Sequence, residues 1–190
     1  EIALRLFTSE ANVYKRLNRA RKRLRELNIR PAEMNDADLS QRQSAVHQIL
    51  YLIFTEGHLS ANTDMAIRRQ LCDEGIRLTT LLADHPVRQT PETQALLALM
   101  HLHSARLSSR QDASGGLLLL EEQDRDLWNP SEIRQGLARL AESAQGDTFS
   151  RYHAEAGIAA EHCLAPSFLE TRWDRLAENY ELLERIAPSA

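Results

Sequence analysis

The residues that could carry out chemistry are few, and their spacing does not suit a catalytic or metal site. Cys72 and Cys163 are the only cysteines, which is too few for a disulfide framework or a cysteine zinc site. His101 and His103 stand two apart on an expected helix, where side chains at that spacing point in different directions. His162, next to Cys163, has the same difficulty, and no glycine-rich phosphate loop or nucleophile motif is present. We therefore predict no enzymatic activity, no metal and no cofactor.

Charge is distributed unevenly along the 190 residues, whose formal net charge is -4. Residues 1–30 contain nine Lys or Arg and three Glu, whereas the remainder contains 14 basic and 24 acidic residues. A basic segment joined to an acidic body indicates that the segment contacts a polyanion and the body contacts something else. A solvated helix face is the alternative interpretation of the basic segment.

The basic segment also has the periodicity of a helix. Between residues 12 and 27 the apolar positions recur at spacings of three and four, at Val13, Leu17, Ala20, Leu24 and Leu27. A shorter apolar pattern precedes it at Ile2, Ala3 and Leu6, and the hydroxyl of Thr8 or Ser9 could cap the second helix. A short helix, a tight turn and a longer basic helix are typical of the last two helices of a helix-turn-helix.

Residues 1–24, EIALRLFTSEANVYKRLNRARKRL, resemble the end of region four of bacterial sigma-70-type factors, especially the extracytoplasmic-function kind. The matching positions are Glu1-Ile2-Ala3, Leu6, Ser9, Val13, Arg16-Leu17, Arg19-Ala20-Arg21 and Leu24. Response-regulator helix-turn-helices share part of this spacing, yet they usually carry His at the position of Arg16. The resemblance implies a factor that binds the RNA polymerase core and the upstream element of a promoter.

The resemblance implies DNA-binding roles for one side of the second helix. Asn12 and Lys15, early on the helix, are the candidates for contacts with base edges. The candidates for phosphate contacts are Arg16, Arg19, Lys22 and Arg23. Because the chain starts inside this domain and lacks region two, we expect a C-terminal fragment. Its apolar stripe should then be mobile, or should dock on the body or on a second copy.

The body is predicted to be all-α. Helical patterns occupy residues 42–56, 64–83, 91–108, 131–144, 150–164 and 168–186, and no segment alternates as a half-buried strand should. Thr90 and Ser131 are the expected caps of the third and fourth patterns, with Pro91 in the first turn. We expect a partial helix-turn-helix followed by antiparallel helix pairs. No apolar run approaches the roughly 20 residues that span a bilayer, so we expect no membrane contact and a cytoplasmic location.

The body resembles the helical, tetratricopeptide-like extension that follows region four in one group of extracytoplasmic-function sigma factors. The matching strings are YLIFTEGH at 51–58, LLALM at 96–100, QDRDLW at 123–128, Tyr152 with residues 156–160, and Trp173 with Tyr180. Trp173, Leu176 and Tyr180 also fit the start of a tetratricopeptide repeat. Either the chain stops before further repeats or this is a chance amphipathic helix.

Two interpretations fit the polar string Gln123-Asp124-Arg125. In the structural one, Asp and Arg pair and bond the loop backbone while Trp128 packs beneath. In the functional one, a docking surface for the missing sigma domains or for RNA polymerase is formed by Phe54, Glu56, Gln123, Asp124, Arg125 and Trp128.

The predicted organisation is an incomplete region-four helix-turn-helix at 1–29, a linker at 30–41, the helical extension at 42–165 and the start of a possible repeat at 166–190. The predicted function is transcription initiation, as the C-terminal part of an extracytoplasmic-function sigma factor. The alternative is a helical protein-binding scaffold whose basic head contacts a partner or RNA.

Overall fold

A computed structural model describes residues 2–27, 36–60, 66–86 and 89–188. Within these ranges the chain is helical, with a single β-bridge between Gln111 and Leu117 and no strand, so the all-α prediction is confirmed. The α-helices are α1 (Ile2–Arg5), α2 (Glu10–Leu27), α3 (Asp36–His58), α4 (Arg69–Ala83), α5 (Pro91–Ser104), α6 (Pro130–Ser143), α7 (Arg151–Leu164) and α8 (Trp173–Ile186). Short 3-10 turns η2 (Leu107–Ser109), η3 (Leu120–Glu122) and η4 (Arg125–Leu127) lie between α5 and α6.

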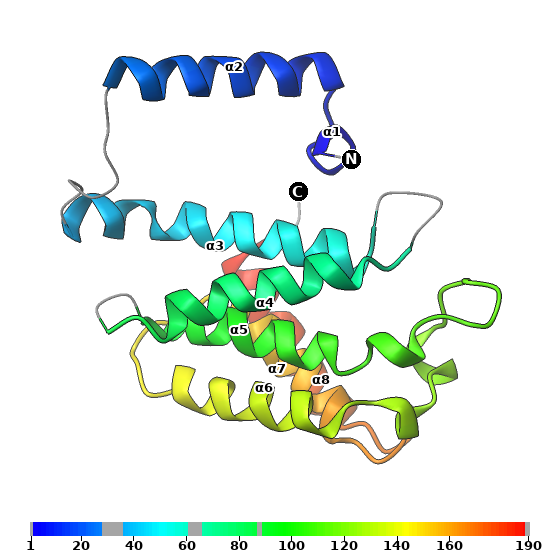
Figure 1. The fold of residues 1–190 in the computed structure, drawn as a ribbon. Coiled ribbons are helices and arrows are strands. Elements are labelled where there is room, and N and C mark those ends of the chain that lie inside the picture. The colour runs from blue at the N-terminus through cyan, green and yellow to red at the C-terminus, as the bar shows by residue number, and fades with distance from the viewer. Residues whose placement is uncertain (1, 28–35, 61–65, 87–88, 189–190) are drawn as a thin grey trace.

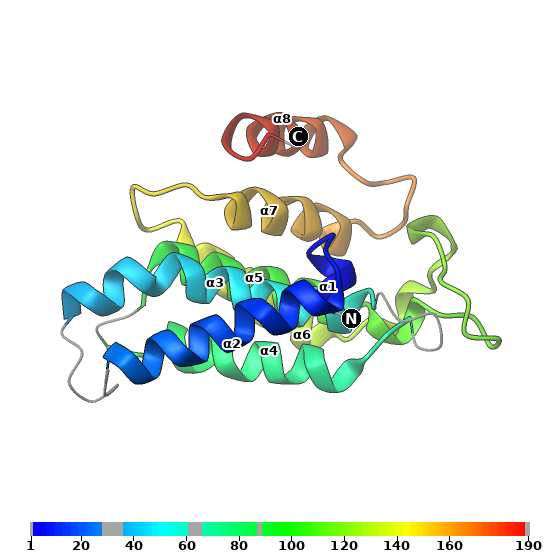
Figure 2. The ribbon, with the colours of Figure 1, turned by 90° about the horizontal axis from the view of Figure 1, so that it is seen from above.

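Consecutive helices from α3 to α8 run antiparallel, as Figures 1 and 2 show from two directions. The central helix is α5, which packs against α3, α4, α6 and α7. Its residues 95–100 are AlaLeuLeuAlaLeuMet, and each is at most 2% exposed. A helix that is apolar on every side is stable only when neighbours cover it on every side. The composition of α5 therefore places it in the middle of the body.

The starts of two of these helices follow from their caps. The Thr90 hydroxyl accepts the Thr93 N–H at 3.2 Å, and Pro91 occupies the first turn of α5 as predicted. At α6 the cap is Asn129, whose side-chain oxygen accepts the Ser131 N–H at 2.9 Å. The prediction of Ser131 as this cap was therefore wrong. Asn129 is the better acceptor because Pro130 follows it and can begin the helix.

Four predicted boundaries are corrected, two of them because the helices expected over 64–83 and 168–186 begin at Arg69 and Trp173. The helix α3 begins at Asp36, so residues 36–41 of the predicted linker are helical, while its residues 30–35 lie outside the described residues. The helix expected over residues 91–108 ends at Ser104 and continues as the separate turn η2. At the other end of the chain, α8 packs on α7 through the buried Leu176 and leaves Trp173 and Tyr180 about half exposed.

No helix in the described part of the chain has the length and apolar character needed to cross a membrane.

Candidate nucleic-acid interface

A tight turn sets the angle between α1 and α2. The N–H of Thr8 donates to the Ala3 carbonyl at 2.9 Å, which closes the end of α1, and Phe7 takes a left-handed conformation with φ 47°. That pairing is typical of a Schellman helix end, where glycine is the usual residue. The Ser9 hydroxyl then accepts the Asn12 N–H at 3.3 Å. Of the two candidate caps, Ser9 is therefore the one that caps α2.

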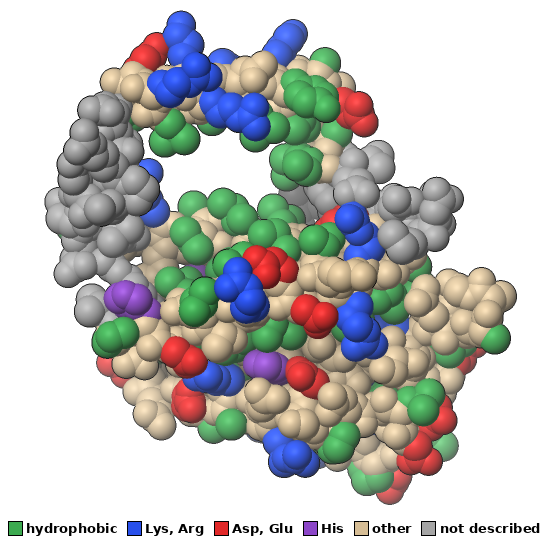
Figure 3. Space-filling view, viewed as in Figure 1, with side chains coloured by type: hydrophobic (Ala, Val, Ile, Leu, Met, Phe, Trp, Pro, Cys, Tyr) green, Lys and Arg blue, Asp and Glu red, His purple; other side chains and the backbone are tan. Residues whose placement is uncertain are grey.

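The six predicted DNA-binding residues share one face of α2. At 3.6 residues per turn they cover about 120° of the helix circumference, and all six are exposed: Asn12, Lys15, Arg16, Arg19, Lys22 and Arg23. The whole helix carries seven basic and two acidic residues and has no buried side chain. Figure 3 shows Lys and Arg side chains along the outer surface of this helix. The helix therefore presents positive charge to solvent along most of its length.

Two of the six residues make local contacts. The Asn12 amide donates to the Thr8 hydroxyl at 3.4 Å, so it would have to leave the turn to contact a base edge. Lys22 lies 3.8 Å from Glu26, one turn later. Because both partners are well exposed, this ion pair is weak and leaves the lysine available to a stronger anion.

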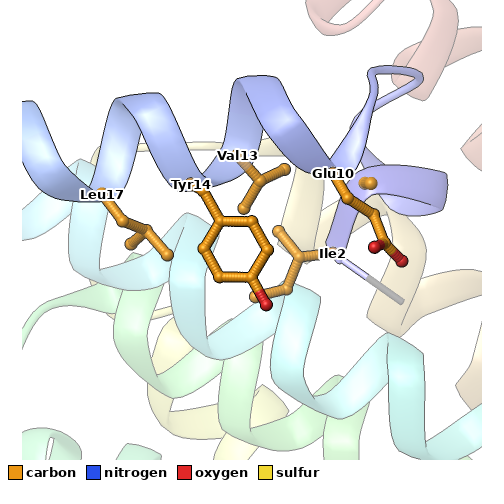
Figure 4. A pocket seen from close by; sticks show the side chains of 6 residues that line it. Ile2, Glu10, Val13, Tyr14 and Leu17 are labelled. Atoms are coloured by element: carbon orange, nitrogen blue, oxygen red, sulfur yellow. The ribbon is translucent and has the colours of Figure 1, made fainter.

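The apolar stripe of α2 is largely uncovered. A groove of about 360 Å³ between α1 and α2 is lined by Ile2, Ala3, Glu10, Val13, Tyr14 and Leu17 (Figure 4). Farther along the helix, Leu24 and Leu27 are about half exposed. In Figure 3 an opening separates α2 from the body, and apolar side chains line both of its sides. The stripe is thus a surface that a further helix could cover.

The structure corrects the predicted docking surface. Phe54 is 3% exposed within the core, and Trp128 and Gln123 are also buried, so these side chains are not available to a partner at the surface. Glu56 is buried too, and accepts a hydrogen bond from the Ser60 hydroxyl at 2.8 Å. The prediction was wrong here because apolar and amide groups near a turn can complete the core as well as contact a partner.

The remaining members of that set, Asp124 and Arg125, reach solvent but are occupied structurally. Asp124 accepts the N–H of Asp126 at 3.0 Å and so caps η4. Arg125 donates to the carbonyls of His162 and Ala165, at 2.7 and 2.8 Å, and thereby closes the end of α7. Its guanidinium also lies 4.4 Å from the centre of the Trp128 ring. The structural interpretation is therefore right about the backbone bonds and about Trp128, although Arg125 bonds α7 rather than pairing with Asp124.

A polar cluster that the sequence did not indicate surrounds Arg125. The Arg106 guanidinium lies 5.4 Å from the centre of the Trp128 ring, which Arg125 also contacts. Arg110 donates a hydrogen bond to the imidazole of His58. The rings of His58 and His103 are 4.6 Å apart. Burial, together with the charges of Arg106 and Arg110, lowers the pKa of His103 to about 3, so it is neutral at pH 7. The sequence signal for this cluster is the pair Arg106 and Arg110, which follow the buried helix α5 and are four residues apart.

No group of three or more His, Cys, Asp or Glu in the described residues is arranged to hold a metal ion. His101 bonds the Glu132 carboxylate at 2.7 Å, which ties α5 to α6. His103 instead lies beside His58 in the polar cluster. His101 and His103 therefore point in different directions, as expected from their spacing.

Comparison with known proteins places the body of the chain in a family. A model of a family of unknown function, DUF6596, matches residues 42–144, just over half of the chain. The chain belongs to this family. The match begins one residue after the end of the predicted linker and covers α3 from its second turn through α6.

An uncharacterized protein from Rhizobium meliloti (strain 1021) is 37% identical over 190 residues, which is 100% of this chain and 44% of the relative. The chain therefore spans less than half the length of the curated relative it matches. The similarity includes α1 and α2, outside the part that the family model matches. No solved structure matches the chain significantly.

Proposed function

We propose that this chain is the C-terminal part of a transcription initiation factor of the sigma-70, extracytoplasmic-function type. In this proposal α2 contacts the upstream element of a promoter, and the helical body regulates the factor or docks on RNA polymerase. The observation that carries the proposal is the exposed basic face of α2, which follows α1 through a tight turn. The resemblance of residues 1–24 to region four supports the same assignment.

The physical basis is the charge pattern of that face. A helix in the major groove lies between two phosphate backbones, so basic side chains along its length release condensed counterions when it binds. Arg16, Arg19 and Arg23 are exposed and form no ion pair with a described carboxylate. Their positive charge is therefore available to phosphates, while Asn12 and Lys15 lie nearer the start of the helix, where base edges are read.

The second candidate function is protein binding by the body. The last helix and the segment before it favour protein binding, because Leu169, Trp173 and Tyr180 are each about half exposed or more. Large aromatic residues at a surface are typical of protein interfaces. In the first proposal this surface contributes to regulation or docking; in the second it is the main function, and the basic head contacts RNA or a protein.

The salt dependence of promoter binding tests the first proposal. Fluorescence anisotropy would measure the affinity of the complete gene product for a promoter duplex at several salt concentrations. We expect Arg19→Gln to weaken binding on all sequences and to reduce the slope of log K against log salt by about 0.9, since one phosphate contact is lost. Asn12→Ala should instead change the preference between upstream elements.

Arg185→Gln is the matched control, because Arg185 is an exposed arginine on α8 that pairs with Glu181. It should leave the slope and the sequence preference unchanged. An Arg19→Gln protein with the wild-type slope would contradict the proposal, and so would an equal effect of the two arginine substitutions.

A further inference from the structure

Positive charge collects at one end of the body, where α3, α5 and α7 all finish (Figure 1). Arg106 and Arg110 lie on either side of η2, and Arg125 begins η4. The ring of Trp128 connects two of them, because its centre is 5.4 Å from the Arg106 guanidinium and 4.4 Å from that of Arg125. Arg110 joins the group through His58, which lies beside His103.

The charge of these arginines is not balanced by acidic side chains. No carboxylate among the described residues forms an ion pair with Arg106, Arg110 or Arg125. Arg106 is 8% exposed, and burial lowers its pKa to about 10, so it is still charged at pH 7. A buried charge without an opposite charge is unfavourable, because it gives up hydration and gains little in return.

Each guanidinium keeps hydrogen-bonding capacity. Arg106 uses only Nε, which donates to the Gln123 side chain at 3.3 Å, and Arg110 and Arg125 each use a single terminal nitrogen. In the described residues, three buried donor nitrogens without a partner belong to this region: Arg110 Nε, Arg125 NH2 and Trp128 Nε1. Because buried polar groups are normally bonded, this concentration indicates a ligand with several acceptors.

Helix ends account for part of this charge. The C-terminal ends of α3, α5 and α7 each carry about half a negative charge, and Arg125 bonds the end of α7 directly. Three half charges do not neutralise three full ones. Among the described residues, Arg106 donates a hydrogen bond to the neutral Gln123 amide and Arg110 donates one to His58, whose pKa is lowered by burial. The hydrogen-bond partners of Arg106 and Arg110 therefore do not neutralise the positive charges of these two arginines.

We propose that this cluster binds a phosphate group, with Arg106, Arg110 and Arg125 as its charged donors. A dianion with four oxygen atoms matches three permanently charged, fork-shaped donors better than a single carboxylate does. Access is open, since Arg110, Arg125 and His58 are only partly buried while Arg106 lies deeper. The phosphate is either free or the end of a phosphomonoester.

The indole N–H of Trp128 provides the readout. The chain has two tryptophans, so its NMR spectrum has two indole signals, and Trp128→Phe identifies which one belongs to Trp128. We expect inorganic phosphate to shift that signal saturably, with chloride holding the ionic strength constant. Arg106→Met and Arg110→Met should each weaken binding about tenfold or more, as expected when one charge-assisted contact is lost. Tighter binding of glycerol phosphate than of inorganic phosphate would indicate an ester ligand, and the reverse order would indicate the free ion.

Two controls separate this site from other basic surfaces. Arg77→Met removes an exposed arginine of α4 that pairs with Glu74, and Arg175→Met removes an exposed arginine of α8 that pairs with Glu178. Both should bind phosphate as the wild type does. If circular dichroism shows that Arg106→Met or Arg110→Met does not fold, Arg110→Lys is the alternative variant. It keeps the positive charge but loses the fork-shaped guanidinium, so it should still weaken phosphate binding. The proposal is overturned by a signal that chloride shifts equally, or by control variants that lose as much affinity as Arg110→Met.

Discussion

At His103 the environment decides the protonation state. Its imidazole is largely removed from water beside Arg106 and Arg110, and its pKa falls to about 3. In the unfolded chain a histidine titrates near pH 6.5. Between those two values the unfolded state therefore binds one more proton than the folded state. The contribution of His103 to the free energy of unfolding is therefore fully present above about pH 7 and is lost as the pH falls from about 6.5 toward 3.

We expect this histidine to make unfolding pH-dependent. As the pH falls from 6.5 to 4.5, the titration of His103 should lower the free energy of unfolding by up to about 1.4 kcal/mol per pH unit. His103→Asn removes the titrating group, so the variant should lose less stability over the same interval, whatever its stability at pH 8. Urea denaturation of the wild type and the variant at pH 8, 6 and 5 measures the free energy of unfolding of each protein at each pH. Identical losses in the two proteins would contradict this account of His103.

Single residues in the cluster could not be predicted from the sequence as a site. His58, Arg110 and His162 are far apart in the chain and meet only because α3, α5 and α7 end on the same side of the body. The basic face of α2 was predictable because one helical period defines it. The predicted docking surface was wrong because the sequence does not show that Phe54 and Trp128 are buried.

At the level of elements, one close approach controls how α3 packs on α4. A Cβ atom added to Gly57 would lie 2.6 Å from the Cys72 backbone nitrogen and 2.9 Å from the Arg68 carbonyl oxygen. The Gly57 carbonyl also accepts the Arg68 N–H at 2.7 Å. Backbone atoms cannot rotate away as side chains can. Only glycine therefore permits this distance between the two helices.

Substitution of that glycine should be costly. Helix propensity alone favours alanine over glycine by about 1 kcal/mol, but the overlap with backbone atoms should outweigh it. We expect Gly57→Ala to lower the free energy of unfolding by about 2 kcal/mol or more. Gly75→Ala is the control, because its Cβ would lie 3.3 Å from the Phe54 Cβ, and we expect a change below about 1 kcal/mol there. Equal stability of the two variants in urea would contradict this packing argument.

The helices of the body were predictable because each has a long apolar period and several have a cap in the sequence. The start of α3 was missed, since Asp36 and Asp38 resemble loop residues although acidic residues also favour the first turn of a helix. The three short 3-10 turns between α5 and α6 were missed as well. They have no apolar period, and tertiary contacts such as those of Arg106 and Arg125 hold them in place.

For the whole molecule, the basic α2 and the acidic body form two parts with different surfaces. The body has its own core around α5, while α2 has no buried side chain and an uncovered apolar stripe. The family match covers much of the body and not the head. These observations agree with the proposal that the head contacts DNA and the body contacts protein.

Footprinting of the initiation complex tests the central claim most directly. The complete gene product would be bound to core RNA polymerase on a promoter, and hydroxyl-radical cleavage would map the protected nucleotides. We predict protection of the upstream element, and its loss when Lys15, Arg19 and Arg23 are together replaced by Gln, with contacts nearer the start site retained. Unprotected nucleotides at that element in the wild type, or an unchanged footprint in the triple variant, would contradict the account.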